Sequence, residues 1–108
     1  MTWFTEGVKS GVISAGTVLA DTGPLPSGVH SVYEMMLSTS VDAVVRLEWR
    51  NAANDGTNIS QTFYLSALAP AIIGPAFSVG DFATDERLRV VLANGLLAGA
   101  VQASLFFV

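Results

Sequence analysis

The chain has 108 residues, a formal net charge of −4 and no cysteine. Without cysteine it forms no disulfides and offers neither zinc–thiolate sites nor thiol nucleophiles. Its lysines and arginines number five, too few for the clustered positive charge that a phosphate backbone requires, so we expect no direct nucleic-acid partner. Because 51% of the residues are hydrophobic and 13% are charged, residues 1–108 are expected to form a single folded domain.

The N-terminal region predicts an extended arm followed by a strand. Residues 7–16 are rich in glycine, serine and valine, and the hypothesis for residues 1–16 is an arm that adds to a neighbouring strand. A first strand is expected near residues 12–20, since residues 21–28 concentrate turn formers. The first residues lack the basic and apolar regions of a signal peptide, so export by that route is not expected.

The central segments alternate apolar and polar residues with the period of two that is typical of strands. This pattern predicts strands over residues 29–39, 42–50 and 59–68. Residues 51–56 predict a turn, because Asn54, Asp55 and Gly56 tolerate positive φ. In the first of these strands, strict alternation places Ser31, Tyr33, Met35 and Leu37 on one face and His30, Val32, Glu34 and Met36 on the other.

The remaining segments complete an all-β pattern. Pro70 and Pro75 each remove a ladder donor, so residues 69–80 predict a connection or at most an edge strand, with a short strand around residues 77–82. Residues 87–93 and 100–108 alternate again, and Asn94-Gly95 predicts a tight turn between them. About seven to eight short strands without a convincing helix indicate a single antiparallel β-sandwich or jelly roll.

Residues 90–108 carry no charge and are apolar on both faces of any strand drawn through them. A chain of this length has little interior for two such faces, so a second copy or another protein is expected to cover one. If the segment is a hairpin, its interface candidates are Val91, Phe106 and Val108. The competing interpretation is a membrane tail anchor, which Asn94-Gly95, Gln102 and Ser104 make less favourable.

No group of residues predicts catalysis, a metal site or a bound cofactor, and we expect no enzyme. His30 is the single histidine, and no nucleophile motif accompanies it, so we expect a histidine at the surface or in a subunit contact. Two carboxylate groups offer oxygen ligands of the kind that Ca2+ prefers, but neither has the EF-hand spacing, and turn chemistry explains both. These groups are Asp81, Asp85 and Glu86, and Asp55 with Asn54 and Asn58.

Four arginines fall on two of the predicted strands. Arg46 and Arg50 share one strand face, and Arg87 and Arg89 share another. If these strands are neighbours, the side chains form one charged patch, with Glu48 or Glu34 as partners. Such a patch either keeps an exposed strand soluble or makes a polar contact at a subunit or capsid interface, where arginine is enriched.

Residues 50–64 (RNAANDGTNISQTFY) and 85–105 (DERLRVVLANGLLAGAVQASL) resemble the small β-sandwich decoration or cement proteins of tailed bacteriophage capsids. The resemblance covers roughly the second half of the chain and rests on β-sandwich texture. It implies a jelly-roll virion protein, commonly trimeric, that is made in the host cytoplasm and reinforces the outside of a head. The implied partners are further copies of the chain, as a trimer rather than a dimer, and the major capsid protein.

A second hypothesis is a carbohydrate- or receptor-binding β-sandwich module. Sugars stack on aromatic faces, so exposure of Trp3, Trp49 or Tyr64 beside carboxylates would favour this alternative.

Overall fold

Nine β-strands make up the regular structure in the described part of the chain. The computed structural model describes residues 3–67, 69, 71–73 and 77–108. The strands are β1 (Trp3–Ser10), β2 (Val18–Asp21), β3 (Gly28–Thr39), β4 (Ala43–Arg50), β5 (Thr57–Leu65), β6 (Ala71–Ile73), β7 (Phe77–Phe82), β8 (Arg87–Leu92) and β9 (Ala100–Phe107). No helix within these residues is long and apolar enough to cross a membrane.

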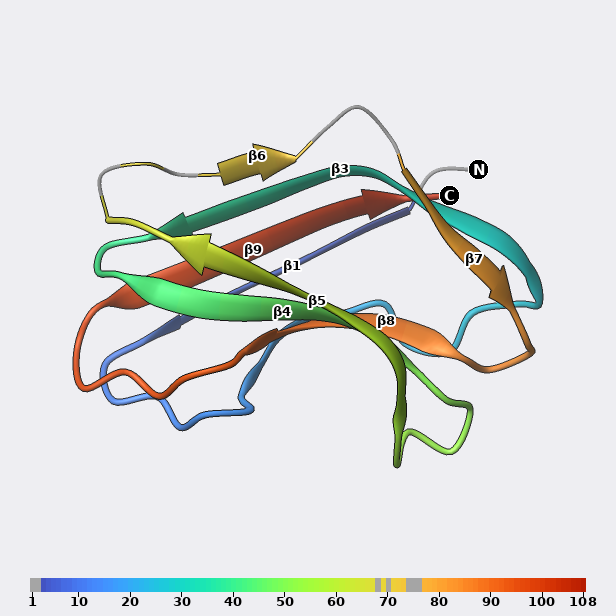
Figure 1. Ribbon diagram of the computed structural model, residues 1–108, viewed down its shortest axis with the longest axis horizontal. Helices are drawn as coiled ribbons and strands as arrows, with labels where there is room; N and C mark the ends of the chain where they lie inside the picture. Colours follow the sequence, from blue (N-terminus) through green and yellow to red (C-terminus); the bar gives the residue numbers. More distant parts are fainter. Residues whose placement is uncertain (1–2, 68, 70, 74–76) are drawn as a thin grey trace.

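The strands form two antiparallel sheets that pack face to face (Figure 1). We name them sheet A, with the order β1-β9-β3-β6 and with β7 also paired to β3, and sheet B, with the order β2-β8-β4-β5. Alternation gives each strand one apolar face, and the two apolar faces meet at the centre. The all-β sandwich that the sequence predicts is therefore confirmed.

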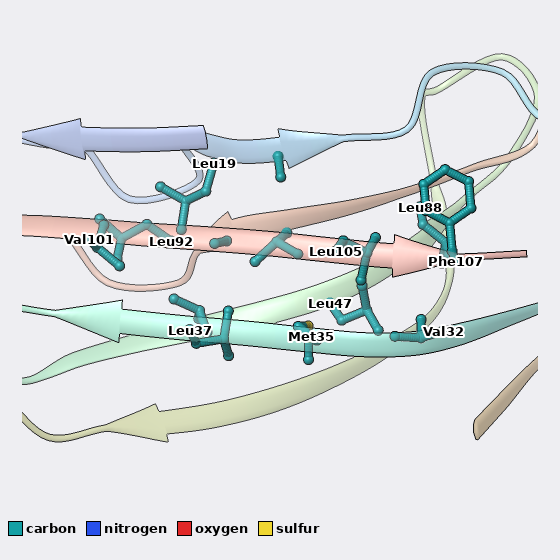
Figure 2. Packing of buried hydrophobic residues seen from close by; sticks show 14 of the residues in the cluster. Leu19, Val32, Met35, Leu37, Leu47, Leu88, Leu92, Val101, Leu105 and Phe107 are labelled. Carbon is teal, nitrogen blue, oxygen red and sulfur yellow. The ribbon is translucent and has the colours of Figure 1, made fainter. Parts of the chain in front are cut away.

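The core lies between the sheets and contains side chains from both (Figure 2). Burying a side chain of this kind contributes about 1.5–3 kcal/mol, so the layer is the main stabilising feature of the fold. Its most buried members are Val32, Met35 and Leu37 of β3, Val45 of β4, Leu88, Val90 and Leu92 of β8, and Val101, Ala103 and Leu105 of β9.

The predicted strands over residues 42–50 and 87–93 are confirmed as β4 and β8, with ends that differ by one residue. The predicted strand 59–68 corresponds to β5, which begins at Thr57 and ends at Leu65. The turn between β4 and β5 is also where the sequence places it. Asn54 has a φ of 57°. The Asn51 N–H donates to the Gly56 carbonyl at 3.0 Å, an ordinary hydrogen-bond length, and this bond closes the turn.

The N-terminal prediction was wrong in two respects. Residues 3–10 are not a free arm, because β1 pairs along its full length with β9 of the same chain. The first predicted strand, residues 12–20, is reduced to β2, since Gly11 and Gly16 take positive φ and the chain turns between β1 and β2. β1 also passes close to sheet B, where the Thr5 hydroxyl donates to the Asp21 carbonyl at 3.1 Å.

Strict alternation along β3 was also wrong. The register against β9 shifts between Val32 and Glu34, which leaves Tyr33 as an extra residue. A β-bulge of this kind reverses the facing of everything that follows it. Val32, Met35 and Leu37 therefore all point into the core, although the uninterrupted pattern separates Val32 from the other two.

The C-terminal segments do not form the predicted hairpin. β8 belongs to sheet B and β9 to sheet A, and residues 93–99 cross from one sheet to the other. On the way, Leu96 and Ile13 exchange two backbone hydrogen bonds, at 2.8 and 2.9 Å. The uncharged run from residue 90 onwards thus lines both walls of one core, which accounts for most of its apolar surplus.

The proline-containing stretch contributes two short strands at the edge of sheet A. β6 pairs with β3 through Met35, Met36 and Leu37, and β7 pairs with the beginning of β3. An edge strand agrees with the interpretation from the sequence. Pro70 and Pro75 themselves lie outside the described residues.

Candidate functional site

All four arginines lie on the two central strands of sheet B. Arg46 and Arg50 are on β4 and Arg87 and Arg89 on β8, and these strands are antiparallel neighbours. Their side chains point away from the core because they alternate with buried residues such as Leu47 and with Leu88 and Val90. We call this outward surface the arginine face. Glu34, the partner considered from the sequence, lies on sheet A instead.

Glu48 is the centre of the arginine face. Its two carboxylate oxygens accept hydrogen bonds from Arg89 Nε at 2.7 Å and from Arg46 Nε at 3.0 Å, while the Glu48 side chain is 5% exposed. Burial opposes ionisation and acts to raise the pKa of Glu48. The hydrogen bonds and charges of Arg89 and Arg46 outweigh that effect, and the pKa lies below its ordinary value.

The other two arginines have partners of their own. Arg50 and Arg87 are directly opposite in the β4–β8 register, an arrangement of like charges that is unfavourable by itself. Arg87 Nη1 lies 3.4 Å from Asp21 Oδ2, and Arg50 donates from Nε to Asn54 Oδ1 at 3.0 Å. These partners draw the two guanidinium groups in opposite directions, towards β2 and towards the β4–β5 turn.

The three apolar interface candidates fall in different places. Val91 is on the arginine face but only 1% exposed, so other side chains of the same chain already cover it. Phe106 points outward from sheet A, and its ring packs against Phe4 with a centroid distance of 4.6 Å. Val108 is partly exposed, and its backbone exchanges hydrogen bonds with Ser31 at 2.9 and 3.1 Å.

The outer side of sheet A carries an apolar surface, which we call the apolar face. Its members are Phe4 and Val8 of β1, Met36 of β3 and Phe106 of β9, which register pairings place in adjacent rows. Phe4, Val8 and Met36 are 49%, 62% and 43% exposed. Phe4 and Val8 were missed because the sequence suggested an arm there. The available signal was the even spacing of Phe4 and Val8, which puts both on one strand face together with Glu6.

His30 is buried, contrary to the expectation of a surface histidine. Its Nδ1 lies 3.0 Å from the Val108 carbonyl oxygen and its Nε2 lies 2.8 Å from the Pro26 carbonyl oxygen. The ring also packs edge-on against Phe82, which stacks on Trp49 with a centroid distance of 4.3 Å. These contacts give His30 a structural role in tying the C-terminal end of β9 to the start of β3.

An open cleft of about 560 Å3 lies at one end of sheet B, where β4 begins and β5 ends. Tyr64 is 83% exposed at its edge. The loop after β8 supplies the opposite side. The start of β4, the end of β5 and this loop all lie at the left-hand end of Figure 1. The lining residues are Asp42, Ala43, Val44, Tyr64, Leu65, Ser66, Asn94, Gly95 and Leu96.

The two carboxylate groups named from the sequence form turns. Glu86 Oε1 accepts a hydrogen bond from the Ala83 N–H at 2.6 Å, and Asp55 Oδ1 accepts one from Asn51 Nδ2 at 2.7 Å. In the described ranges, no three histidine, aspartate or glutamate side chains gather so as to hold a metal ion.

Comparison with known proteins gives distant structural likeness alone. No protein-family model matches the chain, and no curated protein matches it. Among solved structures, the chain is similar to one in the acidic stable capsid structure of Helicobacter pylori bacteriophage KHP30, with a TM-score of 0.46 and 16% sequence identity. The match covers 100% of this chain and 88% of that one. A similarity this distant does not establish what the present chain does.

Proposed function

We propose that the chain is a structural virion protein that binds the outer surface of a capsid as an oligomer and stabilises the head. In this proposal it has no catalytic role. Two sequence segments that resemble capsid decoration proteins support the proposal, together with the β-sandwich on which they lie. The observation that carries it is the apolar face of sheet A.

The apolar face matters because it leaves large side chains in water on a small protein. Phe4, Val8 and Met36 are all more than 40% exposed, and the partly covered Phe106 packs against Phe4. Covering a few hundred Å2 of apolar surface contributes several kcal/mol at about 25 cal/mol per Å2, before the entropy of association is subtracted. Exposed apolar side chains that gather on one face of a sheet are a common mark of a protein interface, and here Glu6, Ser104 and Gln102 lie among them in the register.

The proposed partners are further copies of the chain and the major capsid protein. We favour a trimer over a dimer because the resembling family is commonly trimeric. The apolar face makes the contact between copies, and the arginine face makes the polar contact with the capsid. Arginine is enriched in such contacts, and the arginine face holds four of the five basic residues of an acidic chain.

The test measures the mass of the purified chain in solution by sedimentation and its co-sedimentation with heads. The heads are assembled from the major capsid protein encoded in the same genome. We expect an oligomer in solution and binding to the heads. A chain that stays monomeric and does not sediment with heads contradicts the proposal, as does a genome without a capsid gene.

A matched pair of variants locates the contact. Val8→Lys puts a charge on the apolar face, and Val12→Lys puts the same charge on an exposed loop, where Val12 is 81% exposed. We expect Val8→Lys to shift the mass towards the monomer and Val12→Lys to leave it unchanged. Equal behaviour of the two variants contradicts the assignment of this face.

A further inference from the structure

The cleft at the end of sheet B combines an exposed aromatic ring with polar groups that face the same space. Tyr64 is paired with Val44 across the β4–β5 ladder, and both side chains lie on the outer side of the sheet. Tyr64 is 83% exposed, the most exposed aromatic side chain of the described residues. The Tyr64 ring therefore contributes little to the stability of the fold. It is free to contact a ligand in the cleft.

Polar groups with a defined position line the rest of the cleft. The Asp42 carboxylate is held by the Ala67 N–H, which donates to Oδ1 at 3.2 Å. One such bond uses only part of the acceptor capacity of a carboxylate, which is about four lone pairs. Asn94, in the loop opposite, is exposed and offers an amide that both donates and accepts. The Ala93 N–H donates to the Val44 carbonyl at 2.7 Å and thereby fixes the start of this loop against β4.

We propose that this cleft binds a neutral saccharide. The apolar face of a sugar ring stacks on Tyr64, and neighbouring hydroxyl groups hydrogen-bond to the Asp42 carboxylate and the Asn94 amide. The volume of about 560 Å3 lies within the usual range for small-ligand sites and accommodates one or two sugar units. No lysine or arginine lines the cleft and Asp42 is anionic, so phosphorylated and acidic ligands are disfavoured.

The proposal is independent of the contact between copies that the apolar face makes in the assembly proposed above. The cleft lies at the end of sheet B, on the same outer side as the arginine face, whereas the apolar face lies on sheet A. A virion protein with such a cleft would carry a sugar-binding site in addition to its structural role. Either proposal can therefore fail while the other stands.

The experiment is a nuclear magnetic resonance titration of the full chain. The probes are the methyl glycosides of glucose, galactose, mannose and N-acetylglucosamine, each raised to about 20 mM, well above the millimolar dissociation constants that weak single-site binding gives. We expect at least one glycoside to shift the amide signals of residues 42–44, 64–66 and 94–96 in a saturable manner. Absence of saturable shifts in these segments with all four glycosides overturns the proposal.

The two tyrosines of the chain provide a matched control. Tyr64→Ala removes the stacking surface and is expected to weaken binding by about tenfold or more. Tyr33→Ala removes the other exposed tyrosine ring, on sheet A, where Tyr33 is 58% exposed, and is expected to leave binding unchanged. Asp42→Asn tests the carboxylate with the ring in place and is expected to weaken binding as well. Equal affinity of Tyr64→Ala and the wild type overturns the proposal.

The variants also separate this proposal from the first. We expect Tyr64→Ala to retain the solution mass of the wild type, and Val8→Lys to retain glycoside binding. Because the Tyr64 side chain is largely outside the fold, the amide spectrum of Tyr64→Ala should remain that of a folded sandwich.

Discussion

Glu48 illustrates how a single residue decides the charge balance of a sheet face. A buried carboxylate alone is unfavourable, but Arg46 and Arg89 surround it and hold its pKa below the ordinary value. The consequence for stability has a definite direction. A carboxyl group whose pKa is lowered by folding stabilises the protein above its unfolded pKa, near 4.5, and loses that contribution as pH falls through the folded value.

We therefore expect the stability of the wild type to fall more steeply than that of Glu48→Gln as the pH is lowered below about 4.5. At pH 7 the variant should be less stable by about 1–3 kcal/mol, since two arginines then face a neutral amide. Urea unfolding at a series of pH values measures both. The control Glu6→Gln, on the exposed edge strand β1, should change stability by no more than about 0.5 kcal/mol. Parallel pH profiles for the wild type and Glu48→Gln would refute this account.

Gly7 is a second position where one residue determines the packing. A Cβ atom added at Gly7 would lie 1.6 Å from the Leu19 carbonyl oxygen, so the backbone of β2 leaves no space for a side chain. We expect Gly7→Ala to cost about 3 kcal/mol or more, because one of the two strands must move. Thermal unfolding followed by circular dichroism measures the effect.

The comparison variant is Gly11→Ala. Gly11 has a φ of 85° but nothing within 4 Å of the added atom, so only backbone strain of about 1–2 kcal/mol is expected. If Gly7→Ala proves no more destabilising than Gly11→Ala, β1 and β2 do not approach as closely as described.

Among the strands, the bulge in β3 determines how single-residue deletions should affect the stability of the fold. Tyr33 is the extra residue in the β3–β9 register, so removing it leaves Val32 and Met35 inward with Glu34 outward, in strict alternation. We expect the Tyr33 deletion to fold cooperatively with the same core. Deleting Met36 instead turns Leu37 outward and should cost about 2–5 kcal/mol, comparable to losing a buried leucine.

Chemical denaturation of the two deletion variants, with the near-ultraviolet circular dichroism of the aromatic residues, Trp49 among them, as the probe of native packing, distinguishes them. Trp49 stacks on Phe82 beside the core, so a native spectrum requires both sheets to be in place. If the two deletions destabilise the protein equally, the register of β3 is not set by the bulge.

The strands themselves were largely predictable, whereas their partners were not. Alternation identified β4, β5 and β8 and placed the arginines of β4 and β8 outward. Alternation does not indicate which sheet a strand joins. Asn94-Gly95 therefore suggested a hairpin, whereas residues 93–99 cross from one sheet to the other. The role of β1 was hidden because its pairing with β9 joins opposite ends of the chain. The cleft at Tyr64 depends on three separate segments, and no local pattern brings these together.

For the whole molecule, the pairing of the first and last strands joins the two ends of the chain. Trp3 lies opposite Phe107 in the β1–β9 register, and Figure 1 shows both termini at the same end of the sandwich. The molecule measures 38 × 29 × 18 Å, and its short dimension is that of two packed sheets. The native contacts thus require chain ends that are distant in sequence to meet, which predicts slow folding compared with helical proteins of this size.

The proximity of the ends also predicts that the chain can be circularly permuted. We expect a permutant with a linker of about six Gly and Ser residues between the old termini, opened between Ala52 and Ala53, to fold into the same sandwich. Both alanines are exposed in the β4–β5 turn, and the opening interrupts no strand.

The matched permutant is opened between Val45 and Arg46, inside β4 and next to a fully buried side chain, and it should fail to fold. Thermal unfolding and the near-ultraviolet signal of Trp49 measure the outcome. Because β1 and β9 would then be joined directly, failure of the first permutant would mean that the ends of these strands do not meet as their register requires.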